Sequence, residues 1–356
     1  MNILYLISSL KYGGAEKQTI IDANLMAGNN RVFLGYFFDG PQKEIIDRGV
    51  IVIKINKTNY LFTAINIARI IKQNKIQIIH CSLFSSMIIS AISTLFCNIK
   101  IIWHFHSHEY EIPFIHRVVL KYLSRLPRIK KICFVSRELI NHFHRERYKF
   151  PESKITLLYN SASIPWGIEL HKKNDKNDKI VIGYIGRLVA LKRVEYLIEL
   201  AQYLINQQFT DFEICIVGDG DRYGYLKQET QNKGLSNYIL FEGFQKDVER
   251  YYRNFSLFVN PSGEECLSIA LIDAGIFELP AVAFNTGGNG EIIVNGETGF
   301  IADTKKEFFD RILLLARNKE LREIMGKKAV EHCSQNFSIE THLRQLENLY
   351  REVNNG

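Results

Sequence analysis

The feature of this sequence that most constrains its fold is a repeated alternation between short apolar runs and longer amphipathic segments. Runs rich in Ile, Val and Leu are typical of parallel strands that are buried on both faces. In the first half these runs occupy residues 3–9, 31–37, 76–80, 99–104 and 132–135, and helical spacing occupies residues 15–27 and 60–73. The alternation predicts βαβ units, and therefore an α/β fold with doubly wound parallel sheets.

The alternation pauses once and then starts again. Residues 169–179 form a polar stretch with a single apolar residue. In the second half we expect strands at 180–186, 212–217, 239–241 and 257–259, and helices at 194–207, 225–233 and 269–277. A chain of 356 residues is longer than one hydrophobic core normally supports, so the pause indicates a linker between two domains.

The domain prediction follows from this pause. We predict a first domain at 1–168, a linker at 169–179, a second domain at 180–335 and a C-terminal helix at 336–356 that packs back toward the first domain. Ligands of doubly wound sheets bind outside the carboxyl ends of the strands. The sequence therefore predicts two facing Rossmann-like domains with a central cleft between them.

The net charge of +7 hides an asymmetry between the two halves. Residues 1–168 carry 22 Lys and Arg against 10 Asp and Glu, a net +12, whereas residues 169–356 carry 23 against 28, a net −5. This asymmetry points to an anionic partner for the first half. The six cysteines are widely spaced without a metal-type pattern, so we expect a reduced, cytosolic protein with no structural zinc.

Two apolar stretches resemble targeting or membrane segments. The first ten residues lack the preceding basic residues of a signal peptide, and we interpret them as a strand. Residues 77–99 contain no Asp, Glu, Lys or Arg, but they include His80 and several Ser, Thr and Asn residues. Because polar side chains are costly in hydrocarbon, we predict a strand and a buried helix at 84–96 rather than a membrane span.

Two short motifs follow the first strands of the two predicted domains. Gly13 and Gly14 stand before the first predicted helix, where paired glycines let backbone N–H groups approach an anion. Arg187 and Lys192 follow the strand that opens the second domain, where two cations could neutralise a diphosphate and stabilise its departure. Each motif also occurs without a ligand, as an ordinary turn or as solvated surface charge.

Residues 260–273 contain carboxylates on both sides of a helix start. Glu265 lies in the loop after a buried strand, Ser268 is a suitable N-cap, and Asp273 lies just over one turn inside the helix. The helix N-terminus could bind phosphate, and the two carboxylates could bind hydroxyls at opposite ends of one ligand. The alternative is that Glu264 and Glu265 only interact with the helix dipole and that Asp273 is a surface residue.

These motifs occur in an order and spacing that resemble glycosyltransferase family 4, the retaining group with the GT-B fold of two facing Rossmann-like domains. No single segment is specific, but their order across nearly the whole chain is. The segments that carry the resemblance are 13–16, 186–192, 217–220, 241–243, 261–273, 279–282, 287–291 and 295–300.

The resemblance implies a role for each matching residue. Arg187 and Lys192 would bind the donor diphosphate, and Glu265 would contact hydroxyls of the transferred sugar. Asp273 would hold the ribose, and the glycine turn at residues 13 and 14 would close over the phosphates. The donor-binding set that we predict is Gly13, Gly14, Arg187, Lys192, Gly218, Phe244, Glu265, Cys266, Leu267, Ser268, Ile269 and Asp273.

The resemblance also implies a first-domain histidine beside the sugar. Alternation along a strand would send His104, His106 and His108 to one side, and we choose His106. Glu109 could share this role. The catalytic set that we predict is Arg187, Lys192, Glu265 and His106.

The sequence departs from the family pattern at several positions. Asp273 replaces the usual second Glu, and Cys266 and Ser268 stand where glycine is common. Residues 160–163 are Asn-Ser-Ala-Ser instead of Asn-Gly-Val-Asp, and Ser82 stands where a histidine is usual. Because none of these changes removes the cationic pair or the first acid, we expect activity to survive.

A basic amphipathic segment is the candidate for acceptor or membrane contact. Residues 114–126 carry apolar residues at helical spacing, and Pro127 ends the run. Basic side chains on the other face could contact anionic lipid headgroups, although such a stripe also packs against a core beneath a solvated face. The basic residues are Arg117, Lys121, Arg125, Arg128, Lys130 and Lys131. No nucleic-acid-binding motif is present, so we expect no nucleic acid partner.

The function implied by the resemblance is a retaining glycosyltransferase of bacterial surface polysaccharide synthesis, such as lipopolysaccharide or capsule. The donor would be a UDP-sugar, with GDP- and ADP-sugars as alternatives, and the acceptor a lipid-linked or other glycan. We expect a cytoplasmic protein, peripheral on the inner face of the plasma membrane. Because the leaving diphosphate would accept the acceptor's proton, we expect no metal and no cofactor.

Two alternatives remain open from the sequence. The first is an NAD(P)-dependent dehydrogenase, because residues 218–224 have a GxGxxxG pattern and Glu242 follows at a suitable distance for a ribose-binding acid. It would leave Arg187, Lys192 and Glu265 unexplained. The second is a catalytically inactive homologue that binds a nucleotide sugar or a membrane.

Overall fold

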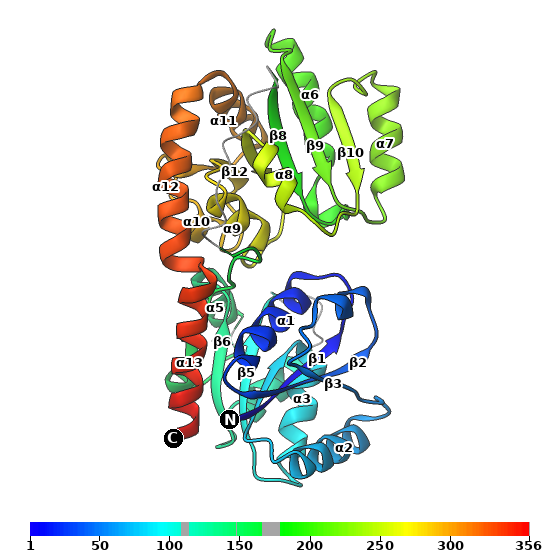
Figure 1. Cartoon of the computed structure of the whole chain (residues 1–356), viewed down its shortest axis with the longest axis vertical. Helices are drawn as coiled ribbons and strands as arrows, with labels where there is room; N and C mark the ends of the chain where they lie inside the picture. The colour runs from blue at the N-terminus through cyan, green and yellow to red at the C-terminus, as the bar shows by residue number, and fades with distance from the viewer. Residues whose placement is uncertain (108–113, 147, 166–178, 356) are drawn as a thin grey trace. The chain divides into compact units, whose positions relative to one another are not determined.

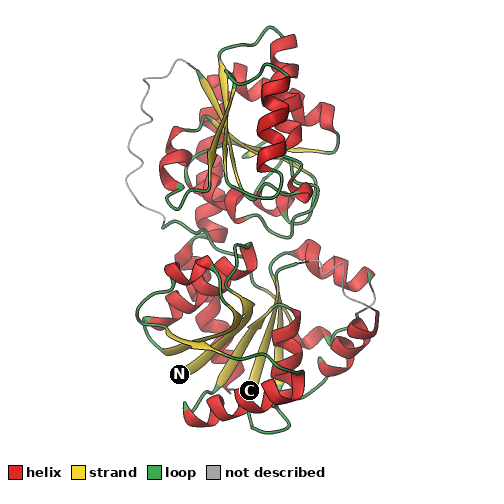
Figure 2. Ribbon diagram, turned by 90° about the vertical axis from the view of Figure 1, so that its right-hand side faces the viewer, coloured by secondary structure: helices red, strands yellow, loops and turns green. Residues whose placement is uncertain are grey.

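The computed structural model describes residues 1–107, 114–146, 148–165 and 179–355 (Figure 1). The chain forms two compact units: unit 1 comprises Met1–Asn160 and Glu340–Gly356, and unit 2 comprises Ser161–Ile339. Each contains one parallel sheet with helices on both faces (Figure 2). The predicted α/β class with doubly wound sheets is confirmed.

The boundary between the units falls earlier in the chain than residue 168. The backbone N–H of Ala162 donates to the carbonyl of Phe337 (2.8 Å), and Ser163 bonds to Asp273, so this segment belongs to unit 2. The predicted linker, apart from Lys179, lies outside the described residues. The C-terminal helix α13 (Ile339–Asn355) belongs almost entirely to unit 1.

Unit 1 contains a seven-stranded parallel sheet in the order β3-β2-β1-β4-β5-β6-β7. The strands are β1 (Asn2–Ser9), β2 (Arg31–Phe38), β3 (Ile51–Lys54), β4 (Ile78–Ser82), β5 (Lys100–Phe105), β6 (Ile129–Phe134) and β7 (Ile155–Leu157). The helices besides α13 are α1 (Gly14–Ala27), α2 (Tyr60–Gln73), α3 (Phe84–Ser93), α4 (Phe114–Leu123) and α5 (Arg137–Arg145). Short 3₁₀ turns lie at Pro41–Ile45 and Glu152–Lys154.

The core of unit 1 explains why these segments form these elements. The residues of β1 from Ile3 to Ile7 are almost completely buried on both faces of the sheet. Helix α2 buries one face, at Ala64, Ile67 and Ile71, and its N-cap Asn59 accepts a hydrogen bond from the backbone of Phe62 (2.9 Å). Helix α13 joins this core through Leu346, Leu349, Tyr350 and Val353.

Unit 2 contains a six-stranded parallel sheet in the order β10-β9-β8-β11-β12-β13. The strands are β8 (Ile180–Ile185), β9 (Phe212–Val217), β10 (Ile239–Gly243), β11 (Leu257–Asn260), β12 (Ala281–Phe284) and β13 (Gly299–Ala302). The helices are α6 (Glu195–Asn206), α7 (Tyr223–Asn232), α8 (Glu249–Asn254), α9 (Ile269–Ile276), α10 (Asn289–Ile292), α11 (Lys305–Arg317) and α12 (Lys319–Phe337). A 3₁₀ turn lies at Ala190–Lys192.

The strand order places a switch point in each sheet. In unit 1 the chain adds β2 and β3 on one side of β1 and then β4 and the later strands on the other side, so the switch point lies beside β1. In unit 2 it adds β9 and β10 on one side of β8 and then β11 to β13 on the other side. Ligands of doubly wound folds bind at the carboxyl ends of strands beside such a point. Gly13 and Gly14 follow β1, Arg187 and Lys192 follow β8, and Glu265 follows β11. The sheet topology therefore positions the predicted motifs at the ligand-binding edge of each unit.

The apolar stretch at residues 77–99 forms a strand and a helix. It contains β4 and the buried helix α3. Among the described residues, no helix is both long enough and apolar enough to cross a bilayer.

Candidate active site

The loop after β8 is held by the loop after β9. Backbone N–H groups of Gly186 and Leu188 donate to the carbonyls of Val217 (3.0 Å) and Asp219 (2.9 Å). Gly218 has a φ of +142°, and a Cβ atom there would lie 1.9 Å from the carbonyl oxygen of Gly186. Gly218 is therefore needed for the close approach of the two loops. Its predicted contact with the donor base stays a prediction.

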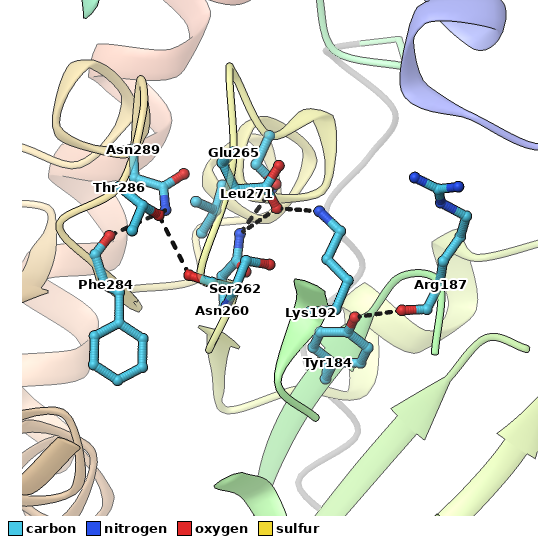
Figure 3. A network of polar contacts seen from close by, with 11 residues as sticks. Tyr184, Arg187, Lys192, Asn260, Ser262, Glu265, Leu271, Phe284, Thr286 and Asn289 are labelled. Carbon is cyan, nitrogen blue, oxygen red and sulfur yellow. Dashed lines mark hydrogen bonds and ion pairs between the residues drawn. The ribbon is translucent and has the colours of Figure 1, made fainter. Parts of the chain in front are cut away.

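Arg187 and Lys192 both extend from this loop (Figure 3). Lys192, at the end of the 3₁₀ turn, forms an ion pair between its Nζ and Oε1 of Glu265. Only 19% of the Lys192 side chain and 12% of the Glu265 side chain are exposed, which strengthens their attraction. Arg187 is exposed, and its guanidinium makes no ion pair within the described part of the chain. The structure thus brings Lys192 and Glu265 together and leaves the Arg187 guanidinium available.

Tyr184 forms a hydrogen bond with the backbone of Arg187. Its hydroxyl donates to the Arg187 carbonyl (3.0 Å), as Figure 3 shows. Burial raises the pKa of Tyr184, and the negative charge of Glu265 raises it further. The phenol therefore stays protonated and keeps this hydrogen bond at any physiological pH.

Asn260 is a site residue that the sequence analysis missed. It ends β11 and is buried, and its Nδ2 lies 3.3 Å from both Oε1 of Glu265 and Oγ of Ser268. Its Oδ1 accepts from the backbone of Ser262 (3.1 Å). A polar residue at the end of an apolar strand was the available signal. Ser268 caps α9 as predicted, accepting from Leu271 (3.4 Å).

The glycine-dense turn after β12 fixes the loop that carries Glu265. The backbone of Gly288 donates to the carbonyl of Cys266 (2.9 Å), and Thr286 Oγ1 donates to the carbonyl of Ser262 (3.3 Å). Gly287 has a φ of +51°, and a Cβ there would lie 1.6 Å from the Glu265 carbonyl oxygen. Figure 3 shows the contact between Thr286 and Ser262 that joins the two loops. The predicted glycine motif therefore packs against the backbone of Glu265 and holds the loop that carries it in place.

Asp273 is buried, with only 2% of its surface exposed, so the alternative interpretation of a surface residue is wrong. Its Oδ1 accepts from the backbone N–H of Ser163 (2.7 Å), and its Oδ2 accepts from the Ser163 hydroxyl (2.6 Å). Both carboxylate oxygens are thus used inside unit 2. The predicted contact of Asp273 with a ribose stays a prediction.

The other predicted donor residues of unit 2 differ in exposure. Leu267, Ser268 and Ile269 are buried, and the contact of their backbone amides with sugar and phosphate that the resemblance implies stays a prediction. Cys266 is half-buried, and Phe244 after β10 is 46% exposed.

The glycine turn of unit 1 is built around Glu16. Gly13 is the N-cap of α1, and a Cβ there would lie 2.1 Å from Oε2 of Glu16. Oε1 of Glu16 accepts from the hydroxyl of Ser9 (3.0 Å), at the end of β1. Gln42 Nε2 donates to the carbonyl of Gly13 (3.1 Å). The turn is therefore packed tightly, and Gly14 has open space around its Cα.

His106 follows β5 in unit 1. Its Nε2 lies 3.4 Å from the Ser82 hydroxyl, and its ring centroid lies 4.0 Å from that of His104. Burial lowers the pKa of His106 to about 4, so its imidazole is neutral near pH 7. A neutral imidazole can exchange hydrogen bonds with a sugar but is a poor proton donor. His108 and Glu109 lie outside the described residues.

Several of the predicted acceptor or membrane cations are occupied within unit 1. Arg117 pairs with Glu146 (2.7 Å), and Lys131 pairs with Glu352. Arg125 donates to the carbonyl of Lys149 (3.1 Å). Arg128 is exposed, while Lys121 and Lys130 are half-buried. This segment presents less free positive charge than its sequence indicates, and its membrane contact stays a prediction.

The glycine pattern and the acid that suggested a dehydrogenase both make contacts within unit 2. A Cβ on Gly220 would lie 2.3 Å from the carbonyl oxygen of Leu188, so this glycine serves loop packing. The carboxylate of Glu242 accepts from the hydroxyl of Tyr251 (2.7 Å). Both features are explained without a dinucleotide.

Known proteins similar to this chain are glycosyltransferases. A relative matched over most of its length is the UDP-Gal:alpha-D-GlcNAc-diphosphoundecaprenol alpha-1,3-galactosyltransferase of Escherichia coli, 24% identical over 93% of this chain and 89% of that protein. The capsular polysaccharide biosynthesis glycosyltransferase CapM of Staphylococcus aureus is 24% identical over 66% of this chain. The match covers 58% of CapM and 38% of the staphylococcal poly(ribitol-phosphate) alpha-N-acetylglucosaminyltransferase, about half the length of these relatives.

Solved structures share the fold. HepE of Anabaena in complex with UDP has a TM-score of 0.86 at 20% identity, covering 99% of this chain and 100% of that one. A glycosyltransferase of Rickettsia africae has a TM-score of 0.82 at 22% identity, covering 99% of this chain and 98% of that one. Residues 29–163 match the model of Glycosyltransferase Family 4, and residues 168–332 match that of Glycosyl transferases group 1. With both models matched in order and the α/β fold in place, the chain belongs to the family 4 glycosyltransferases of the GT-B fold.

Proposed function

We propose that this protein transfers a sugar from a UDP-sugar to a hydroxyl of a lipid-linked glycan during synthesis of a bacterial surface polysaccharide. The observation that carries the proposal is the Lys192–Glu265 ion pair beside Arg187, at the switch point of the unit 2 sheet. Complexes of HepE with UDP and with UDP-glucose support the donor class. The name of the Escherichia coli relative, with its diphosphoundecaprenol acceptor, supports the acceptor class.

The ion pair suits a donor site because a nucleotide sugar has a group for each of its charges. The diphosphate is an anion that a lysine can bind, and the sugar has hydroxyls that a carboxylate can bind. A diphosphate would recruit Lys192 and Arg187, and a sugar hydroxyl would donate to the freed carboxylate of Glu265. Asn260 and the glycine turn keep Glu265 in position for this exchange. The side chains are thus oriented before the donor arrives, which lowers the entropy cost of binding.

The proposed transfer is retaining and needs no metal. The bond from the sugar C1 to the diphosphate oxygen breaks, and a bond from C1 to the acceptor oxygen forms on the same face. The acceptor's proton passes to the leaving diphosphate oxygen. Arg187 and Lys192 would stabilise the negative charge that develops on that oxygen. The neutral His106 would accept or donate a hydrogen bond to the sugar.

The test is loss of UDP binding in an Arg187→Ala/Lys192→Ala variant. Each lost charge-assisted contact should weaken binding about tenfold or more, so the double variant should lose about a hundredfold or more. Isothermal titration with UDP measures this loss. Arg187→Ala alone is a useful second variant, because this side chain is exposed and makes no ion pair among the described residues, so we expect the variant to fold. Lys233→Ala/Lys328→Ala, which removes two unit 2 lysines paired with acids outside the site, is the matched control.

Turnover of UDP-glucose, as hydrolysis or as transfer to a glycan, separates the proposal from its alternatives. We expect turnover by the wild type, unchanged by EDTA, and loss in the double variant. Full turnover in the double variant would overturn the assignment of the site. Thermal stabilisation by NAD(P) but not by UDP would favour the dehydrogenase, and UDP binding without turnover would favour an inactive homologue.

A further inference from the structure

A cluster of aromatic rings holds a lysine at the carboxyl edge of the unit 1 sheet, outside the predicted donor set. The Nζ of Lys57 lies 5.9 Å from the ring centroid of Phe38 and 5.6 Å from that of Tyr60. It also donates a hydrogen bond to the hydroxyl of Ser85 (3.1 Å). We name Phe38, Lys57, Tyr60 and Ser85 the Lys57 cluster. Its members come from the end of β2, the β3–α2 loop and the starts of α2 and α3.

The lysine of this cluster has no carboxylate partner within the described residues, whereas a neighbouring lysine has one. Lys54, at the end of β3, pairs with Asp39. Lys57 is instead held by three rings and one hydroxyl, which fix its ammonium group without neutralising it: besides Phe38 and Tyr60, the buried ring of Phe37 has its centroid 5.6 Å from Nζ. A fixed and uncompensated cation is suited to bind an anionic group.

The rings of the cluster face solvent. Phe38 is 53% exposed and Tyr60 is 38% exposed, although large apolar side chains are normally buried. Exposed rings beside a cation present a flat apolar surface next to a charge. A sugar that carries a phosphate has both complementary parts, since its C–H groups form an apolar face and its phosphate is anionic.

The cluster adjoins the glycine turn of the same unit. The backbone of Leu10 donates to the carbonyl of Phe38 (3.0 Å), and Gln42 Nε2 bonds to the carbonyls of both Lys11 (3.0 Å) and Gly13 (3.1 Å). The cluster thus lies along the sheet edge where ligands of doubly wound folds bind, and its member Phe38 contacts the segment that leads into the predicted phosphate-covering turn.

We propose that the Lys57 cluster binds the phosphate-bearing sugar of the acceptor. The ammonium of Lys57 and the hydroxyl proton of Ser85 would bind phosphate oxygens, and the rings of Phe38 and Tyr60 would contact the sugar's apolar face. The assignment of this ligand as the acceptor rests on the proposed function, whereas binding of a glycosyl phosphate does not. One unpaired cation fits one anionic group, whereas adsorption to an anionic membrane uses several cations together.

The first experiment measures binding of α-D-GlcNAc 1-phosphate, a small glycosyl phosphate, to the full chain by NMR titration. Methyl α-D-GlcNAc serves as the neutral probe and inorganic phosphate as the anion alone. We expect Lys57→Met to weaken GlcNAc 1-phosphate binding about tenfold or more, and Lys57→Arg to retain most of it. Lys54→Met, which removes a lysine already paired at the same edge, is the matched control and should bind like the wild type.

A second pair of variants tests the rings. Tyr60→Ala should weaken binding of GlcNAc 1-phosphate more than binding of inorganic phosphate, because only the sugar contacts the ring. Tyr122→Ala, which removes an aromatic ring that is 64% exposed on α4, should leave both affinities unchanged. Equal affinity of wild type and Lys57→Met for GlcNAc 1-phosphate would overturn the proposal, as would equal binding of the neutral probe.

Two further measurements distinguish an acceptor subsite from a membrane-binding surface and from the donor site. Vesicles of phosphatidylglycerol and phosphatidylcholine test the membrane: a Lys57→Met loss confined to vesicle binding would assign the cluster to a lipid surface and overturn the acceptor subsite. UDP affinity, measured on the same variants, should not change. If the wild type binds GlcNAc 1-phosphate but not UDP, the proposed function fails while the Lys57 site stands.

Discussion

At the scale of single residues, Asp273 and Ser163 form a pair that the sequence shows only as two separate departures from the family pattern. The carboxylate accepts two hydrogen bonds from Ser163 at 2.7 and 2.6 Å and is buried. Aspartate is one methylene shorter than glutamate, and serine supplies a donor where an aspartate is usual. The two departures are therefore chemically complementary, and together they fasten the start of unit 2 to α9.

We predict that Ser163→Ala lowers the free energy of unfolding of unit 2 by about 1.5 to 3 kcal/mol, because it removes a hydrogen bond to a buried carboxylate. Urea unfolding measures the change. A double-mutant cycle with Asp273→Asn should give a coupling energy above about 0.5 kcal/mol. Ser334→Ala, which removes a hydroxyl that donates to the carbonyl of Val330 within the same helix α12, is the control. Additive effects of the two substitutions would contradict the pairing.

At the scale of elements, the segments after β11 and β12 act as one structure. The glycine turn approaches so closely that a Cβ at Gly287 would lie 1.6 Å from the Glu265 carbonyl oxygen, which is a backbone atom and cannot rotate away. The position also has a φ of +51°, which costs a non-glycine residue about 1 kcal/mol or more. Any larger residue must therefore displace the loop that carries Glu265.

We predict that Gly287→Ala reduces turnover of UDP-glucose about tenfold or more while the far-UV circular dichroism stays native. A displacement of about 1 Å in a catalytic loop is enough for such a loss. Gly290→Ala, three residues later in the same segment, has open space around it and should change turnover less than about twofold. Equal losses in the two variants would show that the segment is merely intolerant of substitution.

The elements also show how far sequence reasoning reached. Helix α2 begins and ends where its spacing predicts, because its four apolar contacts recur at helical intervals after an Asn cap. The edge strand β3 was missed, since its four residues are partly exposed and show no alternation in burial. The motifs at the switch points could be predicted because their glycines and charged residues come directly after apolar strand segments in the sequence. The Asp273–Ser163 pair joins positions 110 residues apart, and no local pattern reports such a contact.

At the scale of the whole molecule, unit 1 contains a buried polar network that joins the basic first half of the sequence to the C-terminal helix α13 and that the charge count does not show. Tyr350 of α13 donates to Tyr5 of β1 (2.7 Å), and its hydroxyl lies 2.6 Å from Nδ1 of His80 in β4. His342 of α13 pairs with Asp22 of α1 (2.8 Å). The last helix of the chain is thus fastened to unit 1 by buried polar contacts as well as by its apolar face.

This network predicts that unit 1 loses stability as the pH falls from about 6.5 to about 4. Burial lowers the pKa of both His80 and His106 to about 4, from an ordinary value of 6.5. Between these values the unfolded chain binds more protons than the folded one, so acid favours unfolding. Each histidine should cost roughly 2 to 3 kcal/mol by pH 4. Hydrogen exchange of β4 and β5 amides, corrected for the intrinsic rate, should show this loss.

Two variants make the source of the pH dependence testable. His106→Gln removes one of three histidines whose pKa is lowered by burial, the third being His104, and should make the decline in protection shallower. His144→Gln changes a histidine whose side chain is 41% exposed, and should leave the decline as it is in the wild type. Burial of Asp22 would by itself raise its pKa, but the charge and hydrogen bond of His342 lower it, so its contribution is lost only below about pH 4. Protection that stays constant from pH 7 to pH 4.5 would contradict the neutral state of these histidines.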